Sequence, residues 1–456
     1  MLLTNLKVLV TSTLSSSILE ERVPVREKQD INLKKDVENV LCYKAWIRNK
    51  TNNTFDNTRI LGIVACAKGA EKFLPYTIPK IIQQVSEIGM MADIVIGLNN
   101  GFECPAVIDR FTLLPNVQVI HLYTAEKLAN NIPSKIFDNL MCEGKPYSLS
   151  NFVYPDYQHR IFIVHQKEGV YAAGKIRVLG DIYSSLLLNS IDNGWIPPVI
   201  LFTFDAESQF LIEQNYPFLD LDSNGLKLII SQLNEHSKID IISTRNRFAV
   251  YEKTIIDGTE ILLPDFSQEI PPIQLFLDLM HGRHNGFLWM QGGGTFGRTD
   301  ALISLLVVIA QTYPGIRVED THLSILAKYA GFIYEILLDV VSINKTPSPT
   351  DITMDKPPKK AWIEQVSRWN AGAYALELCY GKHNISAITS GKVSLSILRE
   401  PVKFLKRLKG KDKLNLYTIF HKTKVLASAF FISQKIARNS LDKPDILQGN
   451  EAKACW

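Results

Sequence analysis

Continuous apolar runs separated by helical patterns constrain this chain most strongly. Residues 59–67 form a short apolar run, and apolar residues then recur at helical spacing over 73–85. Two further apolar runs follow at 93–98 and 117–122. Runs in which nearly every position is apolar are typical of parallel strands that are buried on both faces. The sequence therefore predicts an α/β fold with a mostly parallel sheet flanked by helices.

The composition fits one large soluble domain with additions at both ends. The chain has 456 residues, of which 46% are apolar and 21% charged, and it has no apolar run of bilayer-spanning length. Its six cysteines lack the close paired spacing of zinc sites, which indicates a reducing compartment and a cytoplasmic protein. We expect a polar, irregular N-terminal extension over 1–58, a main domain over 59–372, and a helical basic region over 373–456.

The carboxyl ends of the predicted strands are the expected place for a ligand. In parallel sheets, ligands bind in the crevice outside these ends. The loops after residues 66, 98 and 204 should therefore meet at one edge. This brings Ala65, Asn99 and Asn100 close to Asp205, which directly follows the apolar run 200–204.

Asp205 and Glu207 are the candidate metal ligands. They lie two residues apart after a predicted strand, and in an extended chain such side chains point to the same side. Both carboxylates could then reach one divalent cation, Mn²⁺ or Mg²⁺, and the ribose of a nucleotide. The alternative interpretation is a solvated turn.

Glu319 and Asp320 stand at the start of a predicted helix. A carboxylate at this place can cap the helix, or it can accept a proton from a reacting hydroxyl group. We predict that Asp320 is a general base and that Glu319 is its acidic neighbour. His322 follows two residues later, and such a histidine is more typical of a surface or hydrogen-bonded residue than of a metal ligand.

Two further motifs could contact a sugar or a phosphate. Gln365, Arg368 and Trp369 share one helix face, which presents an amide, a fork-shaped cation and a flat ring. The alternative is a helix that Trp369 packs against the domain. Gly293 and Gly294 lie in a glycine-rich stretch that is either an acceptor-side wall, where the backbone approaches a ligand closely, or a tight turn.

Taken together, these motifs resemble the family-2 glycosyltransferases, in particular the Q-x-x-R-W branch that includes cellulose, chitin and hyaluronan synthases. The sequence 205–207 takes the place of the D-x-D motif, 319–320 matches the acidic pair, and 365–369 matches the closing motif. The resemblance covers residues 59–372 and implies the Rossmann-like GT-A fold.

The resemblance implies an inverting, metal-dependent transfer of a sugar from a nucleotide-sugar donor to an acceptor hydroxyl, with Asp320 as base. It implies Mn²⁺ or Mg²⁺ on Asp205 and Glu207. Lys175 matches the Gly-Lys of the helix that precedes the metal-binding strand. The implied donor-binding residues are Ala65, Asn99, Asn100, Lys175, Asp205, Gln365, Arg368 and Trp369, and the implied acceptor-binding residues are Gly293, Gly294 and Trp369.

The chain departs from the family pattern in two places. Asn99 and Asn100 stand where the family has an aspartate, and an amide can still pair with a uracil edge. The metal motif ends in Glu207, whose longer side chain should still reach the cation. The expected donor is a UDP-sugar in preference to a GDP-sugar. The membrane-spanning helices of the synthases are missing, which favours transfer of one or a few sugars. A catalytically inactive nucleotide-sugar or carbohydrate-binding protein of the same fold is the alternative. Nucleotidyl transfer is disfavoured, because 65–69 is not the glycine-rich loop of that class.

A basic segment over 392–438 carries most of the charge asymmetry. It contains twelve lysines and arginines but only two acidic residues, whereas the whole chain has a net charge of +4. Leucines recur beside the cations at helical spacing, which predicts peripheral binding to an anionic membrane surface. The alternative is a helical cap on the main domain, and binding to nucleic acid is the least supported of the three.

Overall fold

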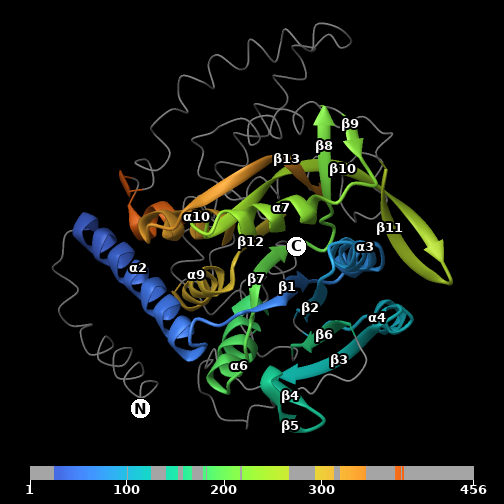
Figure 1. Cartoon of the computed structure of the whole chain (residues 1–456), viewed down its shortest axis with the longest axis horizontal. Helices are drawn as coiled ribbons and strands as arrows, with labels where there is room; N and C mark the ends of the chain where they lie inside the picture. Colours follow the sequence, from blue (N-terminus) through green and yellow to red (C-terminus); the bar gives the residue numbers. More distant parts are fainter. Residues whose placement is uncertain are drawn as a thin grey trace, which may run out of the picture.

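In the computed structural model, one large mixed sheet has helices on both faces (Figure 1). The structure describes residues 25–99, 101–124, 140–151, 158–166, 178–180, 182–215, 218–265, 293–312, 319–345, 375–381 and 383–384. Within them, the predicted α/β class with parallel central strands flanked by helices is confirmed, and it is consistent with the GT-A arrangement. The domain boundaries near residues 58 and 372 stay a prediction.

Among the described residues, thirteen strands make up the sheet. In chain order they are β1 (Asp56–Cys66), β2 (Met91–Leu98), β3 (Val117–Thr124), β4 (Leu140–Cys142), β5 (Lys145–Pro146), β6 (His159–His165), β7 (Pro198–Phe204), β8 (Phe210–Asn215), β9 (Phe218–Asp220), β10 (Ile241–Ile256), β11 (Thr259–Asp265), β12 (Gly294–Arg298) and β13 (Tyr334–Lys345).

The helices are mostly short. They are α2 (Val25–Lys50), the 3-10 turn η3 (Ala70–Phe73), α3 (Leu74–Ser86), α4 (Pro105–Thr112), the 3-10 turn η4 (Leu149–Asn151), the π-helical η5 (Ile182–Leu188), α6 (Asn189–Asp192), α7 (Gly225–Glu235), α9 (Thr299–Thr312) and α10 (Glu319–Tyr329). Among the residues described, no helix has both the length and the apolar character needed to cross a membrane.

The strand order explains how distant segments reach one edge. The sheet runs β5-β4-β3-β6-β2-β1-β7-β12-β10-β13-β8-β9, and β11 pairs with β10. Strands β3, β6, β2, β1 and β7 pair in parallel, so their carboxyl ends lie on the same side. Strand β12 is antiparallel to both of its neighbours, β7 and β10, whereas β13 is parallel to β10.

Both faces of the sheet are buried, which accounts for the continuous apolar runs. Leu61 and Ile63 of β1 belong to a core that includes α2, α9 and α10. Ile60 and Val64 of the same strand belong to a second core with α3, α4 and α7. Because neighbouring strand residues point to opposite faces, a strand between two helical layers needs apolar residues at every position.

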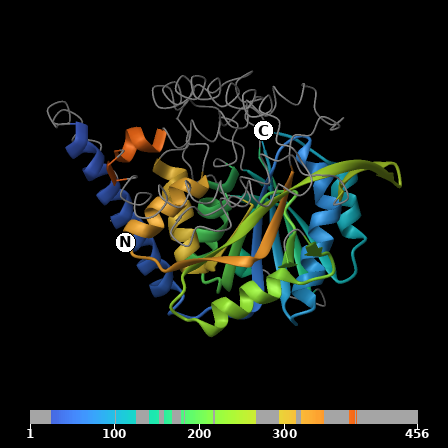
Figure 2. The same cartoon turned by 90° about the horizontal axis from the view of Figure 1, so that it is seen from above.

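Residues 25–50 correct the sequence analysis, because they form the helix α2 instead of an irregular extension. Leu33, Val40 and Ile47 are buried in the core beside the sheet, with Val37 packed against it. Lys44 forms an ion pair with Asp240, at an Nζ–Oδ1 distance of 2.7 Å. The stripe at helical spacing was present in the sequence, but the many polar residues around it obscured it. Figure 2 shows α2 running along the outer side of α9.

The segment 124–170 contributes a central strand. Strand β6 lies between β2 and β3 and pairs with both in parallel, with Leu98 and Tyr123 each opposite His165. No helix or strand was predicted for this segment from its sequence. Its apolar run Ile161–Val164 is fully buried and was the available signal.

Gly97 allows a helix to lie close to the sheet. A Cβ atom at this position would clash with the side chain of Val178, and it would stand 3.0 Å from Cδ1 of Ile182. Both residues belong to the helical layer that follows residue 177. Only a residue without a side chain lets this layer pack directly on β2.

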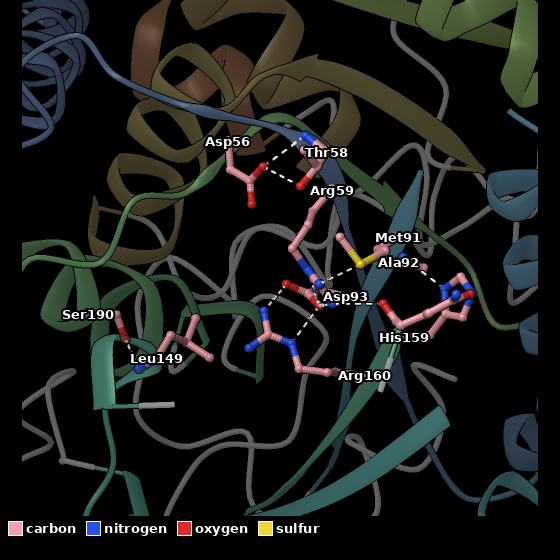
Figure 3. Close-up of polar contacts among 11 residues, drawn as sticks. Asp56, Thr58, Arg59, Met91, Ala92, Asp93, Leu149, His159, Arg160 and Ser190 are labelled. Atoms are coloured by element: carbon pink, nitrogen blue, oxygen red, sulfur yellow. Dashed lines mark hydrogen bonds and ion pairs between the residues drawn. The ribbon is translucent and has the colours of Figure 1, made fainter. Parts of the chain in front are cut away.

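A buried ion cluster ties together the amino-terminal parts of β1, β2 and β6 (Figure 3). Asp93 Oδ1 accepts hydrogen bonds from Arg59 Nη2 at 2.7 Å and from Arg160 Nε at 2.8 Å. Arg160 Nη2 also donates to Asp93 Oδ2. All three side chains are at most 3% exposed. The carboxylate of Asp93 therefore offsets much of the charge of both arginines, and its hydrogen bonds join three strands.

We expect Asp93→Ala to lower the free energy of unfolding by about 3–5 kcal/mol, because it removes the carboxylate that both buried arginines share. Urea denaturation followed by circular dichroism measures this change. Asp257→Ala is the matched control, since Asp257 pairs with Arg110 but is 86% exposed and should cost less than about 1 kcal/mol. Equal losses for the two variants would contradict a special role of the buried cluster.

Candidate functional site

Four parallel strands end at the same level and define the candidate site. Ala65 pairs with Gly97, and Leu98 lies opposite both Cys66 of β1 and His165 of β6. Phe204, the last residue of β7, pairs with Val64. The residues that follow these strands therefore share one edge, as the sequence predicted for Ala65, Asn99 and Asp205.

Asn99 links two of the loops at this edge. Its backbone N–H donates to the carbonyl of Cys66 at 3.0 Å. The side chain is 7% exposed, and within the described ranges its Oδ1 atom has no hydrogen-bond partner. Since buried polar atoms normally find partners, this oxygen is available to a donor group on a ligand.

Asp205 and Glu207 lie in a tight turn, which corrects the extended geometry assumed from sequence. The N–H of Asp205 donates to Oγ of Ser208 at 3.1 Å, and the N–H of Ser208 donates back to the carbonyl of Asp205 at 2.9 Å. Residues 206 and 207 form the turn between β7 and β8, and the carboxylates are partly exposed. Alternation along an extended strand therefore does not set the directions of these two carboxylates.

Tyr251 on β10 holds this turn in place. Its hydroxyl donates to the backbone carbonyl of Glu207 at 3.0 Å, and its ring packs edge-on against Phe73 of η3. Burial raises the pKa of Tyr251 well above its usual value, and the nearby Glu207 raises it further. The side chain of Tyr251 thus connects the turn after β7 with η3, which follows β1.

The two carboxylates alone do not make a complete metal site. Within the described part of the chain, no three His, Cys, Asp or Glu side chains cluster closely enough to hold an ion. Two carboxylate oxygens can still bind Mg²⁺ or Mn²⁺ if a ligand's phosphate oxygens and water complete the coordination. The chemistry of the donor set therefore fits a cation that binds together with a phosphorylated ligand.

Gly293 and Gly294 border the turn. Gly294 pairs with Phe204, so Gly293 lies beside Asp205. A Cβ atom on Gly293 would stand 2.5 Å from Nδ2 of Asn344 and 2.7 Å from Oδ1 of Asn246. The glycine thus makes room for two carboxamide groups, and Gly294 starts β12. Of the two interpretations from sequence, the tight turn does not apply to Gly294.

Sequence reasoning missed the two carboxamides. Asn246 lies on β10 and Asn344 on β13, and both strands run toward the same edge as β7. Asn344 is buried, with Oδ1 lacking a hydrogen-bond partner among residues the structure covers. Both lie among other polar residues of their strands, so their sequence carried no distinct signal, and strand pairing was needed to bring them together.

Glu319 and Asp320 begin α10, as predicted. At the opposite edge of the sheet, the carbonyl of Asp240 accepts from Arg298 at 2.9 Å, and its N–H donates to Ile333 at 2.8 Å. The end of β12 and the start of β13 therefore meet there, just after α10 ends.

Asp320 is partly buried and contacts its own helix. Its Oδ1 accepts the N–H of Thr321 at 2.7 Å and the hydroxyl of the same residue at 3.4 Å. Ser324 donates to the Asp320 carbonyl at 2.7 Å. These contacts fix the carboxylate locally, so the capping interpretation and the general-base interpretation are compatible.

His322 is hydrogen-bonded and fully buried, which agrees with the interpretation preferred over a metal ligand. Its Nε2 lies 2.6 Å from the hydroxyl oxygen of Tyr380. Burial lowers the pKa of His322 to about 3, so the ring is neutral at physiological pH.

Several predicted site residues lie outside the described residues. They are Asn100, Lys175, Gln365, Arg368 and Trp369. The basic segment 392–438 and the first residues of the glycine-rich stretch also lie outside them. Their proposed roles stay predictions.

No protein-family model and no curated protein matches this sequence. Among solved structures, the mannosyltransferase PcManGT from Pyrobaculum calidifontis, in complex with GDP-Man and Mn2+, is 11% identical with a TM-score of 0.41; the match covers 92% of this chain and 99% of that chain. S. aureus TarS 1-349 in complex with UDP-GlcNAc is 10% identical with a TM-score of 0.31, covering 86% of this chain and 94% of that chain. At these identities and TM-scores, the likeness does not establish the function of this chain.

Proposed function

We propose that this chain is a glycosyltransferase that moves a sugar from a nucleotide-sugar donor to an acceptor hydroxyl with inversion. The observation that carries this proposal is the shared edge of the sheet. Asn99, the Asp205–Ser208 turn and Gly293 meet there. This edge offers polar groups for a nucleotide and carboxylates for a cation, and Asp320 at the start of α10 is the candidate carboxylate for a proton.

The donor's diphosphate is assigned to the turn after β7. Asp205 and Glu207 would hold a divalent cation there, and their partial exposure leaves room for phosphate oxygens. When bound, the cation offsets the negative charge that develops on the departing diphosphate. Tyr251 keeps the turn in place through the Glu207 carbonyl.

Asn99 is assigned to the nucleotide base. Its buried Oδ1 can accept a hydrogen bond from a base N–H, and its amide can donate in return. A uracil offers such a complementary edge, and a UDP-sugar is the donor that we propose. Asn246 and Asn344, beside Gly293, are suited to hydroxyl groups of the sugar or acceptor.

Asp320 is the proposed base. In a direct displacement, the acceptor oxygen attacks the anomeric carbon, the bond to the diphosphate breaks, and the hydroxyl proton moves to a carboxylate. The contacts of Asp320 with Thr321 restrict the position of its carboxylate before the reaction.

A screen of UDP- and GDP-sugars tests the proposal. Each donor is incubated with the full chain and Mn²⁺, and release of the nucleoside diphosphate is followed with and without a chelator. We expect turnover of at least one UDP-sugar that stops in excess chelator. Calorimetric titration of the same donors tests the inactive-binder alternative, which predicts binding without release. Failure of every donor to bind would overturn both.

A further inference from the structure

Three buried polar residues from distant parts of the sequence form one hydrogen-bonded chain. The hydroxyl of Tyr380 lies 2.6 Å from Nε2 of His322 and 2.7 Å from Oδ2 of Asp36. His322 and Tyr380 are 0% exposed and Asp36 is 2% exposed. The chain therefore connects α10, the segment after residue 374 and α2 inside the core.

The direction of these hydrogen bonds follows from the groups. A carboxylate only accepts, so the single hydroxyl proton of Tyr380 points to Asp36. The tyrosine oxygen then accepts from Nε2–H of His322, which fixes the tautomer of the neutral imidazole. Hydrogen bonds in such a dry environment are stronger than in water, and losing one partner is costly.

The segment that carries Tyr380 is fastened to α2 along its length. Gln29 Nε2 donates to the carbonyl of Leu378 at 3.0 Å, and Asn384 Nδ2 donates to Asp30 Oδ1 at 2.7 Å. The same segment reaches the end of α10, where the hydroxyl of Tyr329 donates to the carbonyl of Asn384 at 2.9 Å. Residues 375–381 and 383–384 thus contact α10 near both of its ends.

We propose that Tyr380 is a positioning residue that holds the first turn of α10, and with it Asp320, against the rigid helix α2. This inference rests on the proposed function, because it assigns Asp320 as base. His322 lies two residues after Asp320 in the same helical turn. Its anchoring limits the movement of that turn relative to the sheet edge.

A small displacement of the base has a large effect on transfer. A misplacement of about 1 Å can lower a rate about 100-fold, even when the cause lies outside the reacting groups. Donor binding depends on the loops after β1, β2 and β7, which are positioned by the sheet. Loss of the hydrogen bonds of the Tyr380 hydroxyl should therefore lower turnover and leave donor affinity almost unchanged.

Tyr380→Phe tests the inference, because it removes the hydroxyl and keeps the ring. We expect kcat for transfer to fall at least about tenfold, with the donor KM within about twofold. Amide hydrogen exchange over 319–329 should become faster. Tyr334→Phe is the matched control, since the buried Tyr334 hydroxyl has no hydrogen-bond partner in the ranges described; it should behave like the wild type.

Asp36 variants provide the second arm. Asp36→Asn keeps an oxygen that can accept from Tyr380, whereas Asp36→Ala does not, so the asparagine should retain more of kcat. Unchanged kcat and unchanged exchange in Tyr380→Phe would overturn the inference, as would equal losses in kcat and donor affinity. If the wild type turns over no donor, the proposed function fails, and hydrogen exchange alone then decides whether Tyr380 holds α10.

Discussion

Asp205→Ala is expected to abolish donor turnover, to below about 1% of the wild-type rate, because it removes one of two carboxylates available for the cation. The tight turn makes this loss hard to compensate. Ser208 and Tyr251 hold the turn through backbone groups, so another side chain cannot easily move into the vacated position. Nucleoside diphosphate release at a saturating Mn²⁺ concentration measures the effect.

Asp222→Ala is the control for this variant. Asp222 is exposed and follows β9, outside the turn. Its removal changes the net charge equally and should leave turnover near that of the wild type. If Asp205→Ala retained substantial activity in the presence of a chelator, the metal assignment would be wrong.

Asp320→Asn should lower transfer by about 10²–10⁴-fold, because the amide preserves the shape of the side chain but cannot take the acceptor's proton. Donor affinity, measured by calorimetry, should stay within about twofold of the wild-type value. Asp109→Asn, at an exposed position on α4, controls for the loss of one negative charge.

A collapse of donor affinity in Asp320→Asn would point to a structural role for this residue. The hydrogen bonds from Thr321 to Asp320 make that outcome testable, since an amide oxygen can still accept them. A stable, donor-binding variant without transfer activity is therefore the result that supports the base.

Most of the parallel strands were predictable, because a strand that is buried on both faces leaves a continuous apolar run in the sequence. Strands β1, β2, β3 and β7 follow the apolar runs, and their carboxyl ends meet as a parallel sheet requires. Strand β6 and helix α2 were missed for different reasons. The run that forms β6 lies within a segment rich in polar and aromatic residues, and the apolar stripe of α2 is sparse.

The site was less predictable than the sheet, since its geometry depends on contacts that spacing does not encode. The Ser208 hydroxyl converts an expected extended stretch into a turn. Asn246 and Asn344 meet only because β10 pairs with β13 and β12. The hydrogen bond from Tyr380 to Asp36 spans 344 positions, which no local pattern can reveal.

That separation also bears on the order in which the molecule can be completed during synthesis. At typical translation rates of 5–20 residues per second, roughly 20–70 seconds pass between the appearance of Asp36 and that of Tyr380. Throughout this interval, the Asp36 carboxylate of α2 lacks the hydroxyl group of Tyr380. The hydrogen bonds among Asp36, Tyr380 and His322 therefore form late. In a nascent polypeptide halted before residue 380, the first turn of α10, which carries Asp320, would not yet be held against α2.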